Sequence, residues 1–273
     1  PDAGFREVLP EYSSFCPDEK GRDCTRRLPR AFSGRKGTVM LTTIGFDADD
    51  TLWQNEAYFR LTQERFADLL RDHAEPEALM ERLLAAERRN IGAYGFGVKG
   101  FTLSMIETAI EVTEGRVPAS VISELLGAGR AMLDHPVELL PFAREAVETL
   151  ARDFRIVLIT KGDLLHQERK LAQSGLGDLF YAVEIVSDKT AATYRTVFTR
   201  HGTGAEQALM VGNSLKSDVL PALEAGGFGA YVPHGVTWAL ESAEEPQGHP
   251  RYASLADLSA LPGHVRGIRA PAP

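Results

Sequence analysis

The sequence has little cysteine, no excess of positive charge and no long apolar run. Its only cysteines are Cys16 and Cys24, and one such pair is a weak signal for a disulfide or a metal site. Acidic residues outnumber basic ones by 38 to 30, giving a net charge of -8, which argues against nucleic acid as a partner. No apolar stretch reaches the roughly 18 residues that span a bilayer, and a signal-peptide core is absent near the start. We therefore expect two free thiols, no membrane partner and a cytoplasmic location.

Histidine also gives no metal signal, because the seven histidines are scattered without ligand spacing. The hydrophobic content of 44% is ordinary for a folded protein. A chain of 273 residues fits one large domain, or one domain that carries a smaller inserted one.

Residues 1–39 are rich in Pro, Gly, Arg and Asp and show no sustained period of 2 or 3.6. Met40 stands directly before the first convincing strand. We expect residues 1–39 to be a poorly ordered N-terminal extension and Met40 to be the natural start, so their deletion should leave activity intact. An ordered N-terminal arm is the alternative.

The next part of the chain changes from one short strand to a helical block. Residues 42–46 are β-prone and end at a cluster of acids. From residue 55 to about 133, apolar residues recur at steps of three and four, which predicts about four helices. A flexible aromatic loop is expected over residues 92–97. With no strand among them, these helices indicate a separate bundle.

After this block, strands and helices alternate. The expected helices cover residues 143–151, 166–173, 190–200 and 215–225, and the expected strands cover 155–160, 182–186, 208–211 and 229–232. This alternation predicts an α/β fold with a parallel sheet, to which residues 42–46 contribute the first strand. The helical block is then an insertion, giving a core of residues 40–54 and 136–273 and an α-helical cap of residues 55–135. Ligands bind at the carboxyl ends of such strands.

Three carboxylates, Asp47, Asp49 and Asp50, follow the first strand. Their mutual repulsion is tolerable if a divalent cation lies among them. Asp47 is then placed to attack an electrophile while Asp49 handles a proton, and we expect Asp50 to be a bystander. An acidic surface turn is the alternative.

The second and third strands also end in polar residues. Thr160 and Lys161 precede Gly162 and Asp163, and a hydroxyl followed by free backbone N–H groups at a helix entrance suits a phosphate. Lys189 follows the third strand and is able to hold a carboxylate nucleophile ionised. Helix capping and a solvated surface charge are the ordinary alternatives.

The fourth strand leads into the segment from Gly212 to Asp218. Asp218 falls in the first turn of the next helix, from where it is able to reach a metal held by Asp47. Ser214 and Ser217 are expected only to cap that helix.

Taken together, these motifs resemble those of the haloacid dehalogenase superfamily: Asp47-x-Asp49-x-Thr51, then Thr160, Lys189 and Gly212-Asn213-x-x-x-x-Asp218. The resemblance covers roughly residues 43–235 and implies a Rossmann-like core with an inserted cap. It implies Asp47 as nucleophile, Asp49 as general acid/base, and Thr160 and Lys189 as phosphoryl-binding residues, with Lys161 beside them. It also implies a Mg²⁺ cofactor held by Asp47, Asp49, Asp218 and Asn213.

Two positions depart from the family pattern. Asn213 is neutral where many members carry Asp or Glu, which predicts weaker metal affinity without loss of activity. Thr190 stands where proline often follows the lysine, and this change should matter little.

The superfamily includes dehalogenases, phosphonatases, phosphomutases and phosphatases, so the fold alone does not decide the reaction. Asp49 supplies the proton donor that phosphate-ester cleavage requires and that dehalogenases lack. We therefore expect a Mg²⁺-dependent phosphohydrolase that acts on a small phosphorylated metabolite. A phosphomutase is the alternative, and a non-catalytic binding protein is a more remote one.

The identity of the substrate is not encoded in these motifs, although the cap would determine it. The residues proposed to face the leaving group are Trp53, Tyr58, Tyr94, Phe96, Lys99 and Phe101, with packing inside the cap as the favoured alternative. We also expect His234, Thr237 and Trp238, near the last strand, to border the site.

Overall fold

The computed structural model describes residues 40–235 and 238–268. Expectations that concern residues 1–39, including Cys16 and Cys24, lie outside the described residues, as does the one for Thr237. Within the described ranges, no helix combines the length and the apolar character needed to cross a membrane.

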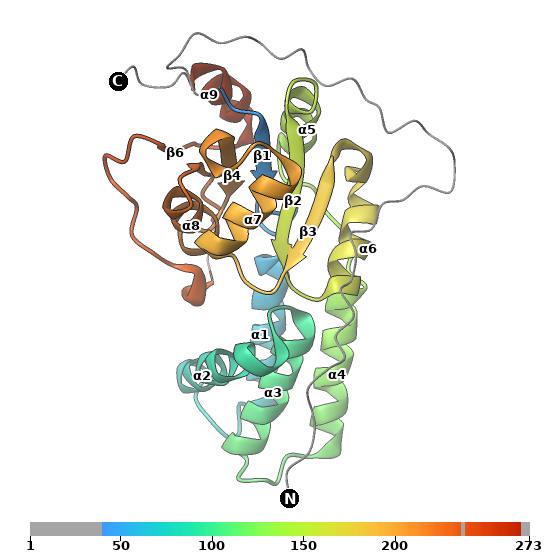
Figure 1. Cartoon of the computed structure of the whole chain (residues 1–273). Helices are drawn as coiled ribbons and strands as arrows, with labels where there is room; N and C mark the ends of the chain where they lie inside the picture. Colours follow the sequence, from blue (N-terminus) through green and yellow to red (C-terminus); the bar gives the residue numbers. More distant parts are fainter. Residues whose placement is uncertain (1–39, 236–237, 269–273) are drawn as a thin grey trace, which may run out of the picture. The chain divides into compact units, whose positions relative to one another are not determined.

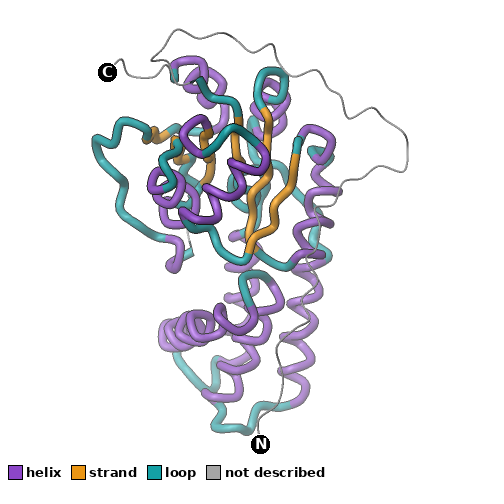
Figure 2. The backbone as a smooth tube through the Cα atoms, in the orientation of Figure 1, coloured by secondary structure: helices purple, strands orange, loops and turns teal. Residues whose placement is uncertain are grey.

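The centre of the molecule is a six-stranded parallel sheet (Figures 1 and 2). The strand order is β3-β2-β1-β4-β5-β6, so β1 lies between β2 and β4 and pairs with both. The strands are β1 (Thr43–Phe46), β2 (Arg155–Lys161), β3 (Ala182–Val186), β4 (Ala208–Gly212), β5 (Phe228–Tyr231) and β6 (Tyr252–Ser254). The change of direction in strand order falls at β1 and β4, which is where ligands bind in sheets of this type.

Alternating side chains of the buried strands pack into two different cores. Ile156 and Leu158 belong to a core that includes residues of α5 (Ala143–Leu150) and α9 (Leu261–Gly267). Val157 and Ile159 belong to a second core with residues of α7 (Ala191–His201) and α8 (Leu220–Glu224). Because successive residues point to opposite faces, residues 156–159 of β2 are all apolar and both faces of the sheet are covered by helices.

Five helices lie between β1 and β2, and the first four of them form the inserted block (Figure 1). These four are α1 (Glu56–Leu70), α2 (Pro76–Tyr94), α3 (Val98–Val112) and α4 (Ala119–Leu133). They have a core of their own, which includes Phe66, Leu83 and Met105. The predicted fold class, a Rossmann-like parallel sheet with an inserted helical block, is confirmed, and all four helices fall within the range predicted for the cap.

The structure differs from the expectations in the details of single elements. Residues 92–94 belong to α2, so the loop before α3 contains only residues 95–97. The helix expected at 215–225 begins as a π-helical turn (Leu215–Val219) and continues as α8. β6 and α9 were not predicted; β6 has only three residues, too few to show a period.

The remaining elements are short or connect those already named. Helix α6 (Leu164–Ser174) follows β2 and contributes Leu171 to the edge of the first core. Short 3-10 helices cover Gly177–Leu179, Ala205–Gln207, Ala239–Glu241 and Leu258–Ala260.

Candidate active site

The carboxyl ends of the central strands open into a cavity of about 170 Å³ that helices α1, α2 and α3 also line. Every residue predicted for catalysis, phosphate binding or metal binding lines this cavity: Asp47, Asp49, Thr160, Lys161, Lys189, Asn213 and Asp218. The residues come from the ends of β1, β2 and β4 and from the turns that follow β3 and β4.

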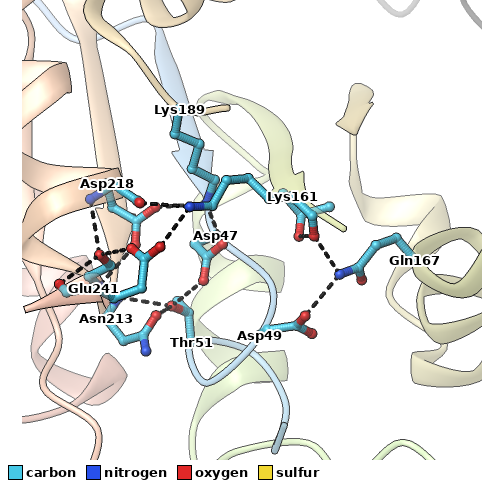
Figure 3. A network of polar contacts seen from close by, with 12 residues as sticks. Asp47, Asp49, Thr51, Lys161, Gln167, Lys189, Asn213, Asp218 and Glu241 are labelled. Atoms are coloured by element: carbon cyan, nitrogen blue, oxygen red, sulfur yellow. Dashed lines mark hydrogen bonds and ion pairs between the residues drawn. The ribbon is translucent and has the colours of Figure 1, made fainter. Parts of the chain in front are cut away.

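At its centre, the ammonium of Lys189 lies between the carboxylates of Asp47 and Asp218 (Figure 3). Lys189 Nζ donates to Asp47 Oδ1 and, at 2.7 Å, to Asp218 Oδ1. All three residues are buried, with exposures of 6% or less. Burial raises the pKa of Asp47 to about 7, Lys189 opposes this change, and the neighbouring Asp218 adds to it. One ammonium thus serves two buried carboxylates, which leaves an excess of one negative charge in this group of three.

Asp218 owes its position to the turn after β4. Ser214 N donates to Asp218 Oδ2 at 3.0 Å, and the Ser214 hydroxyl accepts from Ser217 N at 3.0 Å, so Ser214 caps the turn as predicted. Gly212 is required here because a Cβ atom on it would overlap the Asp218 carboxylate. The Gly-x-x-x-x-x-Asp spacing therefore has a steric reason.

Asn213 and Thr51 lie on the other side of Asp47. Thr51 Oγ1 donates to Asp47 Oδ2 at 3.0 Å, and Asn213 N donates to Thr51 Oγ1 at 3.0 Å. The terminal amide of Asn213 lies 3.2 Å from Asp47 Oδ2, from the main-chain oxygen of Asp49 and from Thr51 Oγ1. If the NH₂ group of Asn213 faces these three oxygens, it donates hydrogen bonds to them. If the amide oxygen faces them instead, the side chain adds a fourth oxygen to the group and no hydrogen-bond donor.

This group of oxygens fits a hard divalent cation, which takes carboxylate, carbonyl and water ligands. No three side chains of His, Cys, Asp and Glu in the described part of the chain form a metal-binding group. The carboxylates of Asp47 and Asp218 therefore provide enough metal ligands only together with the main-chain oxygen of Asp49 and the amide oxygen of Asn213. A cation here would also balance the negative charge that Lys189 leaves in excess.

The carboxylate of Asp49 points away from this centre, toward α6 (Figure 3). It accepts hydrogen bonds from Trp53 Nε1 at 2.6 Å, Gln167 Nε2 at 2.8 Å and Lys170 Nζ at 2.6 Å. Burial favours a higher pKa for Asp49, but Lys170 and these hydrogen bonds outweigh it and lower the pKa.

Gln167 and Lys170 were not identified from the sequence. Both are buried on α6 and three residues apart, so they share one face of the helix. That spacing was the only signal, and it is common on helices that carry no function.

Thr160 and Lys161 lie at the end of β2 in different environments. Thr160 is buried, and its hydroxyl donates to the Lys161 carbonyl at 3.3 Å. Lys161 Nζ donates to Ser217 Oγ at 2.8 Å and to Glu241 Oε1 at 2.7 Å, and lies 3.9 Å from the centroid of the Phe96 ring. The Ser217 hydroxyl thus anchors Lys161 and does not cap a helix, and Glu241 is a site residue that the sequence did not reveal.

Asp50, expected to be a bystander, connects the site to the inserted helices. It has a positive φ of 60°, and its carboxylate accepts from the main-chain N–H groups of Asn55 and Glu56 at 2.9–3.1 Å. His234 Nδ1 lies 3.6 Å from Asp50 Oδ1. The acid therefore stabilises the start of α1.

Of the aromatic and basic residues proposed to face the leaving group, only Phe96 and Phe101 line the cavity, together with Trp238 from beyond β5. Trp53 is fully buried in the sheet core, Tyr94 is 53% exposed, and Tyr58 lines a separate small pocket. Lys99 Nζ pairs instead with Asp163 Oδ1 at 3.2 Å. Four of the six candidates therefore do not line the cavity, and for Trp53 the favoured alternative of packing in a core holds.

The chain is similar to known proteins over most of its length. Residues 41–226 match the family model of haloacid dehalogenase-like hydrolases. A haloacid dehalogenase-like hydrolase from Xanthomonas campestris is 45% identical, with a TM-score of 0.76 over 85% of this chain and 93% of that one. A curated relative, the glyceraldehyde 3-phosphate phosphatase of Methanothermobacter thermautotrophicus, is 23% identical over 77% of this chain and 93% of its own length.

More distant structures share the fold. A hydrolase of this class from Bacillus subtilis, solved with bound magnesium, has a TM-score of 0.59 at 17% identity and covers 83% of this chain and 99% of that one. Solved haloacid dehalogenases also match, at identities of 19–20%. The family match, which covers more than half of the chain, agrees with the motifs at the strand ends: the protein belongs to the haloacid dehalogenase-like hydrolases.

Proposed function

We propose that this hydrolase is a Mg²⁺-dependent phosphatase that cleaves a small phosphate monoester, with Asp47 as the nucleophile. The observation that carries the proposal is the shared position of Lys189, whose ammonium contacts both Asp47 and Asp218 in a buried cavity. The curated relative that is named a phosphatase supports the same reaction class. The magnesium-bound relative supports the choice of metal.

In the proposed reaction, an oxygen of Asp47 attacks the phosphorus atom and the bond to the ester oxygen breaks. Asp49 gives a proton to the departing alkoxide, which leaves a phosphoaspartyl group on Asp47. Asp49 then takes a proton from water, which attacks the phosphorus and releases phosphate, and Asp47 is restored. To reach the leaving group, the Asp49 side chain has to turn away from Lys170.

Lys189, Thr160 and Lys161 bind and orient the phosphoryl group in this scheme. The ammonium of Lys189 favours the ionised form of Asp47 and stabilises negative charge on the phosphoryl oxygens. The metal would be held by Asp47, Asp218, Asn213 and the main-chain oxygen of Asp49, and would supply Lewis-acid stabilisation of the same charge.

Dehalogenation is the competing reaction class, because solved dehalogenases share the fold. A dehalogenase forms its ester on the first aspartate without a metal and has no use for a second acid at the position of Asp49. The three donors that hold Asp49 in the cavity favour the phosphatase. A phosphomutase would use the same residues, and the fate of the phosphoryl group separates the two: free phosphate is released only by the phosphatase.

The test is hydrolysis of 4-nitrophenyl phosphate with and without Mg²⁺ by the wild type and by Asp47→Asn. We expect activity that requires the metal and a loss of at least about 10³-fold in the variant, since the nucleophile is removed. Release of halide from a 2-haloacid serves as the competing assay. Metal-independent turnover, or a variant as active as the wild type, would refute the mechanism.

A further inference from the structure

The cavity has two chemically different ends. Lys161, Lys170 and Lys189 line the end formed by the sheet and α6. The lining residues between Asn55 and Ser104, which we call the cap wall, include Glu56 and Glu87. Among the described residues, the cap wall has no lysine, arginine or histidine. The sheet end also carries acids, among them Asp47, Asp49 and Asp218, so a ligand that spans the cavity meets lysines and acids together at one end and acids without a basic side chain at the other.

Glu87 is the most deeply buried acid of the cap wall. Only 7% of it is exposed, and its carboxylate accepts one long hydrogen bond, from Trp238 Nε1 at 3.4 Å. A carboxylate has about four acceptor positions, and burial without a positive partner raises the pKa of Glu87 to about 7. A buried acid with so few partners is costly, and a ligand that donates hydrogen bonds or carries positive charge would remove that cost.

Glu56 strengthens this interpretation because it lies near Glu87. Burial raises the pKa of Glu56 to about 8, and the negative charges of Asp50 and Glu87 contribute, with a smaller opposing effect from Arg60. Two acids that repel each other within one cavity favour a cation between them.

Aromatic rings complete the surroundings of this acidic pair. The rings of Phe96 and Trp238 meet edge to face with centroids 6.2 Å apart. Phe59 and Phe101 form a second pair, with centroids 4.9 Å apart, and all four rings line the cavity. Aromatic faces attract ammonium groups. The Phe96 ring already has the Lys161 ammonium 3.9 Å from its centroid, so it is the other three rings that favour, with the acids, a positively charged ligand.

We propose that the substrate is a phosphate monoester of an amino alcohol, whose protonated amine is bound by Glu87 and Glu56 of the cap wall. The proposal rests on the phosphatase function proposed above, which places the phosphoryl group beside Asp47 and Lys189. A leaving group with a carboxylate is repelled by the cap wall. An ester with an alkyl leaving group provides no positive partner for the Glu87 carboxylate.

The experiment is calorimetric binding to the full chain carrying Asp47→Asn, in the presence of Mg²⁺, so that the esters persist. The probes are the O-phosphates of ethanolamine through hexanolamine, each compared with the alkyl phosphate in which a methyl group replaces the ammonium. For the chain length that reaches Glu87, we expect the amine to bind about 10- to 100-fold more tightly, as for a hydrogen bond to a charged group. Phosphoglycolate should bind more weakly than the alkyl esters.

A second substitution, Glu87→Gln, should bring the amine-to-alkyl ratio close to one while preserving the shape of the side chain. The matched control is Glu81→Gln, the same change at an exposed position of the same helix, which should leave the ratio unchanged. Folding of the Glu87→Gln variant is checked by its melting temperature, which should not fall, because burial of an amide costs less than burial of a carboxylate.

The outcomes separate this inference from the proposed function. Equal affinities for amines and alkyl esters at every length, or a full preference retained by Glu87→Gln, would overturn the inference while aryl phosphate turnover by the wild type still supports the phosphatase. Conversely, if the wild type hydrolyses no phosphate ester, the phosphatase is refuted, and the binding ratios still decide whether the cap wall recognises an amine.

Discussion

Replacement of Lys170 by methionine tests whether Asp49 carries protons. Lys170 Nζ lies 2.6 Å from Asp49 Oδ1, and the two side chains are 9% and 22% exposed. Burial by itself favours a higher pKa for Asp49, but the Lys170 charge and the surrounding hydrogen bonds lower it. Since a neighbouring cation depresses the pKa of a carboxyl group by about 1–3 pH units, we expect Lys170→Met to raise the pKa of Asp49 by a similar amount.

The assay compares the pH dependence of kcat/KM for an alkyl phosphate and for 4-nitrophenyl phosphate. An alkoxide needs a proton as it leaves, whereas nitrophenolate does not. If protonated Asp49 is the donor, activity on the alkyl ester falls as the pH rises through the pKa of Asp49 in the free enzyme. The substitution should move this fall about 1–3 pH units upward for the alkyl ester and leave the aryl profile in place.

The same substitution should lower stability. Loss of one partner from a buried ion pair costs about 3 kcal/mol, which lowers the melting temperature by about 6–12 °C in a chain of this size. Because the pKa of Asp49 is depressed in the folded protein, this contribution is complete at pH 7 and is lost only as the pH falls through the folded-state pKa. Arg169→Met is the control. The ion pair between Arg169 and Asp134 is exposed, so its loss should shift the melting temperature by less than about 2 °C.

A variant that melts earlier but keeps the wild-type pH profile on the alkyl ester would refute the reasoning. Lys170 would then support the site only structurally, and the proton would come from a group other than Asp49.

Three further predictions concern the remaining parts of the site. Gly212→Ala should displace the Asp218 carboxylate and lower kcat by at least about 10²-fold, measured with an aryl phosphate; Gly127→Ala, whose added Cβ meets nothing within 4 Å, should leave activity unchanged. Asn213→Asp should tighten Mg²⁺ binding about tenfold through its added charge, measured by calorimetry, and an unchanged affinity would exclude residue 213 from the metal site. Leu83→Ala should cost about 2–5 kcal/mol in the fully packed core of α1–α4, measured by thermal unfolding, with a smaller loss indicating that this core relaxes around the cavity.

The sheet and its polar strand ends were predictable because buried parallel strands have a strong sequence signature. Residues 156–159 form an uninterrupted apolar run, and a polar Thr160 follows it at once. The structure buries this run on both faces and places Thr160 at the cavity. Wherever a run of this kind ended in acids, hydroxyls or lysine, the position of a site residue followed from the parallel topology alone.

Residues that reach the site from neighbouring elements were not predictable in the same way. Lys170 contacts Asp49 from α6, more than 100 residues further along the chain, and Glu241 contacts Lys161 from a segment without any period. The positions of these side chains depend on tertiary packing, which one sequence does not reveal. The aromatic candidates illustrate the same limit. Trp53 and Phe96 could not be distinguished from the sequence, but only Phe96 lines the cavity.

The three acids after β1 show how partners from other elements divide one kind of side chain among different tasks. Asp50 accepts main-chain N–H groups at the start of α1, which fixes the connection to the cap. Asp49 has a full ion pair with Lys170, so its charge is compensated before any ligand arrives. Asp47 shares the ammonium of Lys189 with Asp218. It is therefore the acid of the three whose negative charge is not balanced by a positive group of its own, and this imbalance supports the proposal that Asp47 is the nucleophile.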